Sequence, residues 1–218
     1  MKYPSSALAG TLLLGLAAAV AQQSSTPVRW AEGAPNATSE MKNDTKIEGL
    51  KTDDVHIFAS IADLKETQYN RVWIQVANHG KTPIDFDPQA VVLVNVVKEK
   101  MVAAEVPDKA AKSIEKFGEA KSQEMSSAKC ENMAATQCQP APAQLQVARQ
   151  ISAYSSQQAQ WIRDNALTKK TLAPGEEVQG IVVFRKDKKA ASYILRCPVG
   201  TQIFEFPVTA ENKEPSYD

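Results

Sequence analysis

The sequence has no excess of charge of either sign. Its 25 basic residues balance 25 acidic ones, so the formal net charge is zero. Proteins that bind nucleic acid or anionic membrane surfaces usually carry a basic excess, and this balance argues against both classes. The sequence also lacks the glycine-rich phosphate loop, the GxSxG elbow, and the HExxH and CxxC motifs. No enzyme class is indicated, although a site assembled from distant residues stays open.

Long hydrophobic runs are also missing beyond the first 21 residues. No later segment approaches the ~20 apolar residues of a membrane-spanning helix, so we predict no transmembrane segment in the mature chain. At the start, Lys2 precedes an Ala- and Leu-rich run at residues 7–20, which is too short to span a bilayer and ends in small residues. We interpret residues 1–21 as a secretory signal peptide, cleaved before Gln22. The protein is therefore expected in the periplasm or outside the cell.

Cysteine and histidine are scarce, with three and two residues. Three cysteines in an exported chain permit one disulfide and leave one thiol. Cys130 and Cys138 would lie about 12 Å apart on a continuous helix, so a bridge between them requires the helix to break. The prolines that follow favour such a break, and Cys197 is then a buried thiol on a strand. The alternative joins Cys197 to one of the other two cysteines.

Residues 22–50 are polar and contain no sustained hydrophobic period. Such a segment cannot bury enough apolar surface to order itself, so we predict a disordered polar tether from which only Trp30 packs onto the domain. Residues 211–218 are expected to form a flexible tail. Residues 51–210 are predicted to be one domain.

Within that domain, alternating hydrophobic residues predict β-strands in two blocks. The first block contains strands near residues 55–62 and 72–77. Its β-branched run at residues 91–97 is expected to be covered on both faces. The second block, residues 172–208, predicts three strands joined by short turns as a meander. The alternating apolar positions expected in the core are Val55, Ile57, Ala59, Val72, Ile74, Val76, Val178, Val182, Phe184, Tyr193, Leu195, Phe204, Phe206 and Val208.

Between these blocks the hydrophobic period becomes helical, and Pro107 with Asp108 suits a helix start. We predict a helical hairpin inserted at about residues 100–170. The aromatic side of its second helix carries Tyr154 and Trp161. We interpret this side as a packing face, and the alternative is that the two aromatic residues contact a binding partner.

His79, Asp85 and Asp87 lie close together in the sequence, in a stretch that suits a corner between strands. Pro83 and Pro88 fix φ on either side of a short Ile-Asp-Phe-Asp segment, in which alternation places both carboxylates on the solvent face. We interpret the stretch as a structural turn. The alternative is a weak metal or small-ligand site formed by these three residues.

Turn signatures carry a resemblance to a known kind of domain. An Asn and Gly turn follows an early strand, and a Leu, Pro, Gly, Glu turn opens a late one. The matching residues are Asn78, Gly80, Pro83, Leu172, Pro174, Gly175 and Glu176. In this layout the two β blocks resemble exported bacterial immunoglobulin-like domains of unknown function. The resemblance implies an immunoglobulin-like antiparallel β-sandwich in the cell envelope, and it transfers no catalytic residue.

Three hypotheses of function follow. The leading one is a non-enzymatic interaction or scaffold module of the cell envelope, whose helical insertion or sheet edge recognises a protein partner. The second is an exported protein that binds a metal or small ligand with His79, Asp85 and Asp87. The third is an exported enzyme whose site the motifs do not reveal. No cofactor is predicted, and the oligomeric state stays open.

Overall fold

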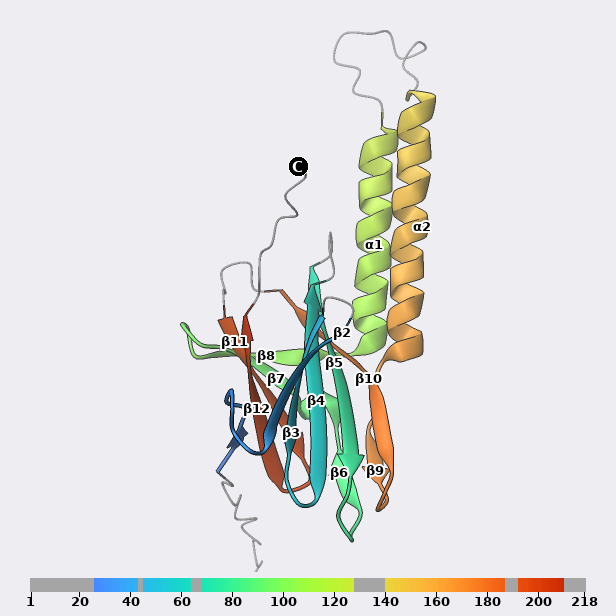
Figure 1. Ribbon diagram of the computed structural model, residues 1–218. Helices are drawn as coiled ribbons and strands as arrows, with labels where there is room; N and C mark the ends of the chain where they lie inside the picture. Colours follow the sequence, from blue (N-terminus) through green and yellow to red (C-terminus); the bar gives the residue numbers. More distant parts are fainter. Residues whose placement is uncertain (1–25, 43–44, 64–67, 128–139, 187–191, 210–218) are drawn as a thin grey trace, which may run out of the picture.

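The computed structural model describes residues 26–42, 45–63, 68–127, 140–186 and 192–209. Within them the protein is mainly β, with twelve strands in one curled sheet, a half-barrel, and two helices at one side (Figure 1). The strands are β1 (Val28–Arg29), β2 (Ala37–Lys42), β3 (Thr45–Lys51), β4 (Val55–Asp63), β5 (Tyr69–Asn78), β6 (Ile84–Phe86), β7 (Val92–Asn95), β8 (Lys100–Glu105), β9 (Lys170–Leu172), β10 (Glu177–Arg185), β11 (Ser192–Val199) and β12 (Gln202–Thr209). The helices are α1 (Pro107–Ser126), α2 (Pro142–Asn165) and the short 3₁₀ helix η1 (Pro88–Ala90).

The sheet is continuous, with the strand order β1-β12-β11-β7-β8-β10-β5-β4-β3-β2; β6 and β9 pair beside this path. The predicted β-rich class with a helical insertion is confirmed. An immunoglobulin-like sandwich of two separate sheets is not confirmed, because β8 pairs with both β7 and β10 and so joins the two halves. We predicted that residues 100–105 belong to the insertion, and the prediction is wrong because they form this connecting strand.

The two halves of the sheet enclose one apolar core. Alternation along β4 and β5 buries the predicted apolar residues, and β11 and β12 contribute from the opposite half. The members of this core include Val55, Ile57, Val72, Ile74, Val76, Phe86, Leu93, Phe184, Leu195, Cys197, Phe204 and Phe206. Each such side chain stabilises the fold by about 1.5–3 kcal/mol when it is fully buried.

β10 is covered on both faces. Its Val182 and Phe184 lie in the main core, whereas Ile181 and Val183 lie in a second cluster beneath the helices. We predicted this role for residues 91–97, and that prediction is wrong. β7 ends at Asn95, and the next residues, Val96 and Val97, are 49% and 81% exposed.

The predicted meander of the second β block is also wrong. β11 and β12 do form a hairpin, and Gly200 supplies the positive φ of 56° at its turn. However, β10 pairs with β5 and β8 and does not pair with β11. The consecutive strands β10 and β11 therefore lie in different halves of the curled sheet.

Much of the predicted tether is part of the sheet. β2 and β3 form a hairpin, β3 pairs with β4, and β1 runs parallel to β12. Backbone hydrogen bonds to neighbouring strands order this polar segment, and its Leu50 lies in the main core, with Val28 and Ala37 packed against that core. Trp30 packs against the core as expected, and its indole N–H donates to the Thr38 carbonyl at 2.9 Å.

The helices α1 and α2 form the predicted hairpin, and small side chains let them approach closely. A Cβ added to Gly118 of α1 would lie 2.2 Å from Ser155 Oγ of α2. At the base of the hairpin, Ala110, Ile114 and Ile162 pack onto β10 in the second cluster. The remaining turns project beyond the end of the sheet (Figure 1).

Candidate functional site

The corner that holds His79, Asp85 and Asp87 is built around Asn78. The Asn78 side chain is fully buried and donates to the carbonyl oxygens of Thr82 and Leu172, both at 2.9 Å. Its Oδ1 accepts from the Gly80 amide at 2.9 Å. One side chain therefore closes the turn after β5 and ties that turn to β9.

The two aspartates of this corner have local structural partners. Asp85 is exposed, on the face of β6 opposite to that of the buried Phe86. It accepts a 2.5 Å hydrogen bond from Thr171 Oγ1. Asp87 accepts from the Gln89 amide at 2.9 Å and so caps η1. Lys169 Nζ lies 3.5 Å from the second oxygen of Asp87. These contacts stabilise the corner and β9.

His79 contacts the other histidine instead of the aspartates. The rings of His79 and His56 lie 4.0 Å apart between centroids and are tilted by 42°. Burial lowers the pKa of His56 below its ordinary value, and the charges of His79 and Lys51 lower it further. No three His, Cys, Asp or Glu residues in the described parts of the chain come together as a group that could hold a metal ion.

We expect acidification to destabilise the protein through this histidine pair. The folded-state pKa of His56 is lowered, so the unfolded chain binds more protons, and stability is lost as pH falls from about 6.5 through the folded-state pKa. The melting temperature, followed by circular dichroism between about pH 7.5 and 5, should fall less steeply for His56→Gln than for the unaltered protein. Identical slopes would contradict this assignment.

The cysteine predictions are tested in part. Cys197 is fully buried and free, as expected of a buried thiol on a strand. Burial raises its pKa, so the thiol stays protonated and unreactive. Cys130 and Cys138 lie outside the described residues.

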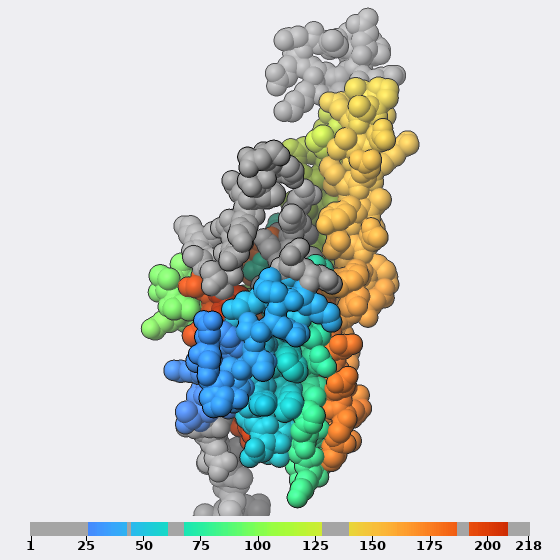
Figure 2. Space-filling view, in the orientation of Figure 1, coloured from blue at the N-terminus to red at the C-terminus, as the bar shows by residue number. Residues whose placement is uncertain are grey.

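The second helix exposes part of its predicted aromatic side. Val147 and Tyr154 are 40% and 44% exposed, so they do not belong to a packing face. The face that packs on α1 is displaced around the helix and consists mainly of small residues such as Ala148, Ser155 and Ala159. In the space-filling view, α2 forms an open surface along the projecting hairpin (Figure 2).

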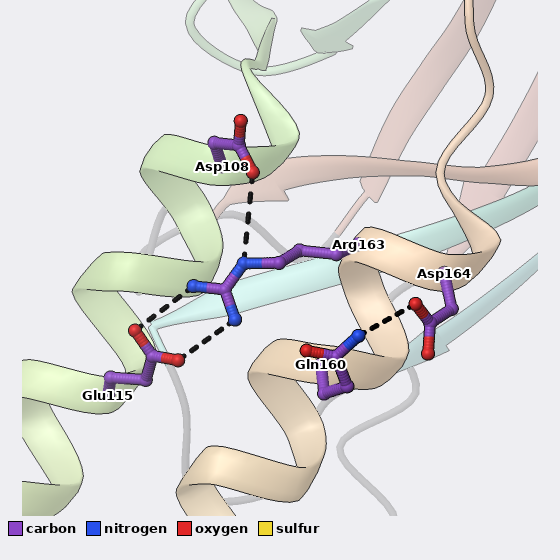
Figure 3. Close-up of polar contacts among 5 residues, drawn as sticks. All are labelled: Asp108, Glu115, Gln160, Arg163 and Asp164. Carbon is purple, nitrogen blue, oxygen red and sulfur yellow. Dashed lines mark hydrogen bonds and ion pairs between the residues drawn. The ribbon is translucent and has the colours of Figure 1, made fainter.

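Polar contacts hold the base of the hairpin together (Figure 3). Arg163 of α2 donates two hydrogen bonds to the carboxylate of Glu115 on α1, at 2.9 and 3.1 Å, and its Nε lies 3.7 Å from Asp108. The hydrogen bonds from Arg163 lower the pKa of Glu115, which stays ionised at neutral pH. Within α2, the Gln160 side-chain amide donates to Asp164 at 2.8 Å. The two helices are thereby fixed relative to each other at their base.

A pocket of about 460 Å³ lies where the end of α2 meets the outer face of the sheet. It is lined by Thr45, Ser60, Arg71, Trp73, Trp161, Asp164, Asn165, Ala166, Gln179, Gly180 and Ile181. Trp161, which we predicted as a partner contact, therefore lies in a different place from Tyr154. Its ring is covered by the Arg71 guanidinium, 4.7 Å from the ring centroid. No local sequence motif predicts this pocket, because its residues come from separate elements.

Among the residues that the structure describes, neither helix is long and apolar enough to cross a membrane. Comparison with known proteins adds no relative. The chain matches no protein-family model, no curated protein and no solved structure.

Proposed function

We propose that the protein is a non-enzymatic, extracytoplasmic interaction module of the cell envelope, in which the α1–α2 hairpin binds a protein partner. The curled sheet serves as the scaffold, on which the base of the hairpin packs. The observation that carries the proposal is the exposed apolar pair Val147 and Tyr154 on α2.

The geometry of this pair suits helix-mediated recognition. Val147 and Tyr154 are seven residues apart, so they lie on one stripe of α2. Exposed aromatic side chains on a helix often serve as anchors in an interface. The close approach of Gly118 to Ser155 and the Glu115–Arg163 hydrogen bonds hold the hairpin in one shape. Such a preformed surface loses little conformational entropy on binding.

The free edge of the sheet is a weaker candidate for the same role. β2 is the edge strand beyond β3, and its side chains are mostly exposed. Glu40 and Lys42 on this strand place charges of both signs along the edge. Charged edge strands oppose the addition of a further strand. The hairpin is therefore the surface that we assign to the partner.

The test compares partner capture by residues 22–218 with capture by the double variant Val147→Ser, Tyr154→Ser. Gln150→Ser, Gln157→Ser is the control, because both glutamines are exposed on α2 with the same seven-residue spacing. Proteins recovered from a native envelope extract are identified, and their affinities are measured by calorimetry. We expect the first variant to bind at least about 30-fold more weakly, since an anchor residue contributes about 2 kcal/mol or more. The control should bind like the unaltered chain.

Circular dichroism first establishes that both variants retain their helices. The proposal is overturned if the unaltered chain recovers no partner, or if the Val147 and Tyr154 variant binds every partner as tightly as the control does.

A further inference from the structure

The pocket beside α2 has an aromatic floor and an aromatic wall. Trp73 of β5 lies on the outer sheet face, between Ser60 of β4 and Ile181 of β10 in the register of the sheet. Trp161 of α2 and the Arg71 guanidinium that covers it line the pocket from the helix side. The ring of Trp73 thus supplies an apolar surface inside a concave site.

A glycine sets how closely α2 approaches this site. A Cβ on Gly180 would lie 2.6 Å from the backbone oxygen of Asn165 and 3.0 Å from a Leu167 carbon. The chain leaving α2 is also joined to β10 by a hydrogen bond from the Leu167 amide to the Ile181 carbonyl, at 3.0 Å. These contacts hold the C-terminal end of α2, which carries Trp161, in place against β10 of the sheet.

Hydrogen-bonding groups of both kinds face this space without a protein partner. In the described part of the chain, the Arg71 guanidinium forms a cation–π contact but no hydrogen bond or ion pair, and the Gln179 amide forms no hydrogen bond. Asp164 Oδ1 accepts from Gln160, which leaves Oδ2 as an acceptor. Asn165 donates to the Trp161 carbonyl, which leaves its own side-chain oxygen as an acceptor. The lining therefore offers donors and acceptors together.

We propose that this pocket binds a neutral saccharide of one or two rings. A sugar ring has an apolar C–H face that stacks on an indole, and hydroxyl groups around its rim that both donate and accept hydrogen bonds. The volume of about 460 Å³ lies within the usual range for small-ligand sites. This site is separate from the Val147 and Tyr154 surface, so it adds a ligand to the proposed function and does not depend on it.

The charges of the lining oppose the other ligand classes. A cationic ligand attracted to the tryptophans would meet Arg71, and an anionic ligand attracted to Arg71 would meet Asp164. A purely apolar ligand would bury the guanidinium, carboxylate and amide groups without partners, which is unfavourable. A neutral ligand with many hydroxyl groups avoids each of these costs.

The experiment titrates residues 22–218 with a panel of neutral sugars: glucose, mannose, galactose, N-acetylglucosamine, cellobiose and N,N′-diacetylchitobiose. Binding is followed by saturation-transfer NMR and by tryptophan fluorescence. We expect at least one member to bind with a dissociation constant of about 1 mM or tighter. Trp73→Ala should weaken it at least about tenfold, Trp73→Phe less, and Asp164→Asn about fivefold. The control Gln150→Ser, Gln157→Ser should bind normally.

Two further probes decide the ligand class. The proposal is overturned if tetramethylammonium or benzoate binds more tightly than every saccharide, or if no saccharide binds below about 20 mM. It is also overturned if a saccharide binds equally well after the Trp73 and Asp164 substitutions. If Trp73→Ala does not fold, then Trp73→Phe and Asp164→Asn carry the test. If Trp73→Phe or Asp164→Asn weakens sugar binding but still captures the protein partner, the sugar site is independent of the proposed partner surface on α2.

Discussion

Replacing Asn78 by aspartate is expected to lower the free energy of unfolding by about 3–5 kcal/mol at neutral pH. The two side chains have nearly the same shape, so packing hardly changes. However, the Asn78 amide donates to two carbonyl oxygens inside the protein, and a carboxylate has no proton to give them. Asn78→Asp therefore buries a negative charge beside two acceptors, which is the most costly outcome that this corner permits.

The dependence on pH gives the Asn78→Asp prediction a second readout. Burial beside two carbonyl oxygens raises the pKa of the introduced carboxyl in the folded state, so its penalty grows as pH rises above about 4. Thermal unfolding should show a melting temperature lower by about 10 °C at pH 7 and by less at pH 4.5. Gln89→Glu, at an exposed position of the same corner, should change it little. A loss below about 1 kcal/mol at pH 7 would contradict this role of Asn78.

The corner also shows what sequence can predict about this fold. Turn residues and alternating apolar residues are local signals, and they correctly located the corner, β4, β5 and the alternation of β11. Pro107 marked the start of α1 for the same reason. Strand order depends instead on pairing between distant segments. Neither the link through β8 nor the order imposed on the N-terminal strands has a local signal.

Interactions in the candidate sites depend on the same distant pairings. The contact between His56 and His79 follows from the register of β4 and β5, in which His56 lies opposite Ala77. A predicted hairpin register would have indicated this pair. The pocket joins residues near positions 60, 72, 163 and 180, so no single motif could reveal it. Tyr154 and Trp161 share a helical stripe, yet one is exposed on the hairpin and the other lies at the sheet.

Alternation along β12 predicts that the Glu205 side chain is exposed, and this is wrong. Glu205 lies between the core residues Phe204 and Phe206 on β12, so its side chain points to the outer face of the sheet. It is nevertheless only 3% exposed. Arg29 of β1 approaches one carboxylate oxygen at 2.8 Å, and Arg196 of β11 contacts the other at 2.8 and 2.7 Å. One carboxylate thus joins three strands.

We expect Glu205→Ala to lower the free energy of unfolding by about 2–3 kcal/mol. This loss is smaller than is usual for a broken buried ion pair because both arginines keep access to water. The Arg29 side chain is 73% exposed, so Arg29→Ala should cost less than about 1 kcal/mol, and Arg196→Ala, at 37% exposure, should cost more. Denaturant unfolding measures these three values. Glu40→Ala, on the exposed edge strand β2, is the control and should change stability by less than about 0.5 kcal/mol.

The loss at Glu205 should be concentrated at the N-terminal strand. β1 pairs with β12 over only two residues, and the Trp30 amide donates to the Glu205 carbonyl at 2.8 Å. Without the Glu205 carboxylate, Arg29 no longer holds this short strand, so the Trp30 amide should exchange with solvent about tenfold faster, while amides of β11 change less. Hydrogen exchange followed by NMR distinguishes the two strands. If all amides speed up equally, then Glu205 does not act by anchoring β1.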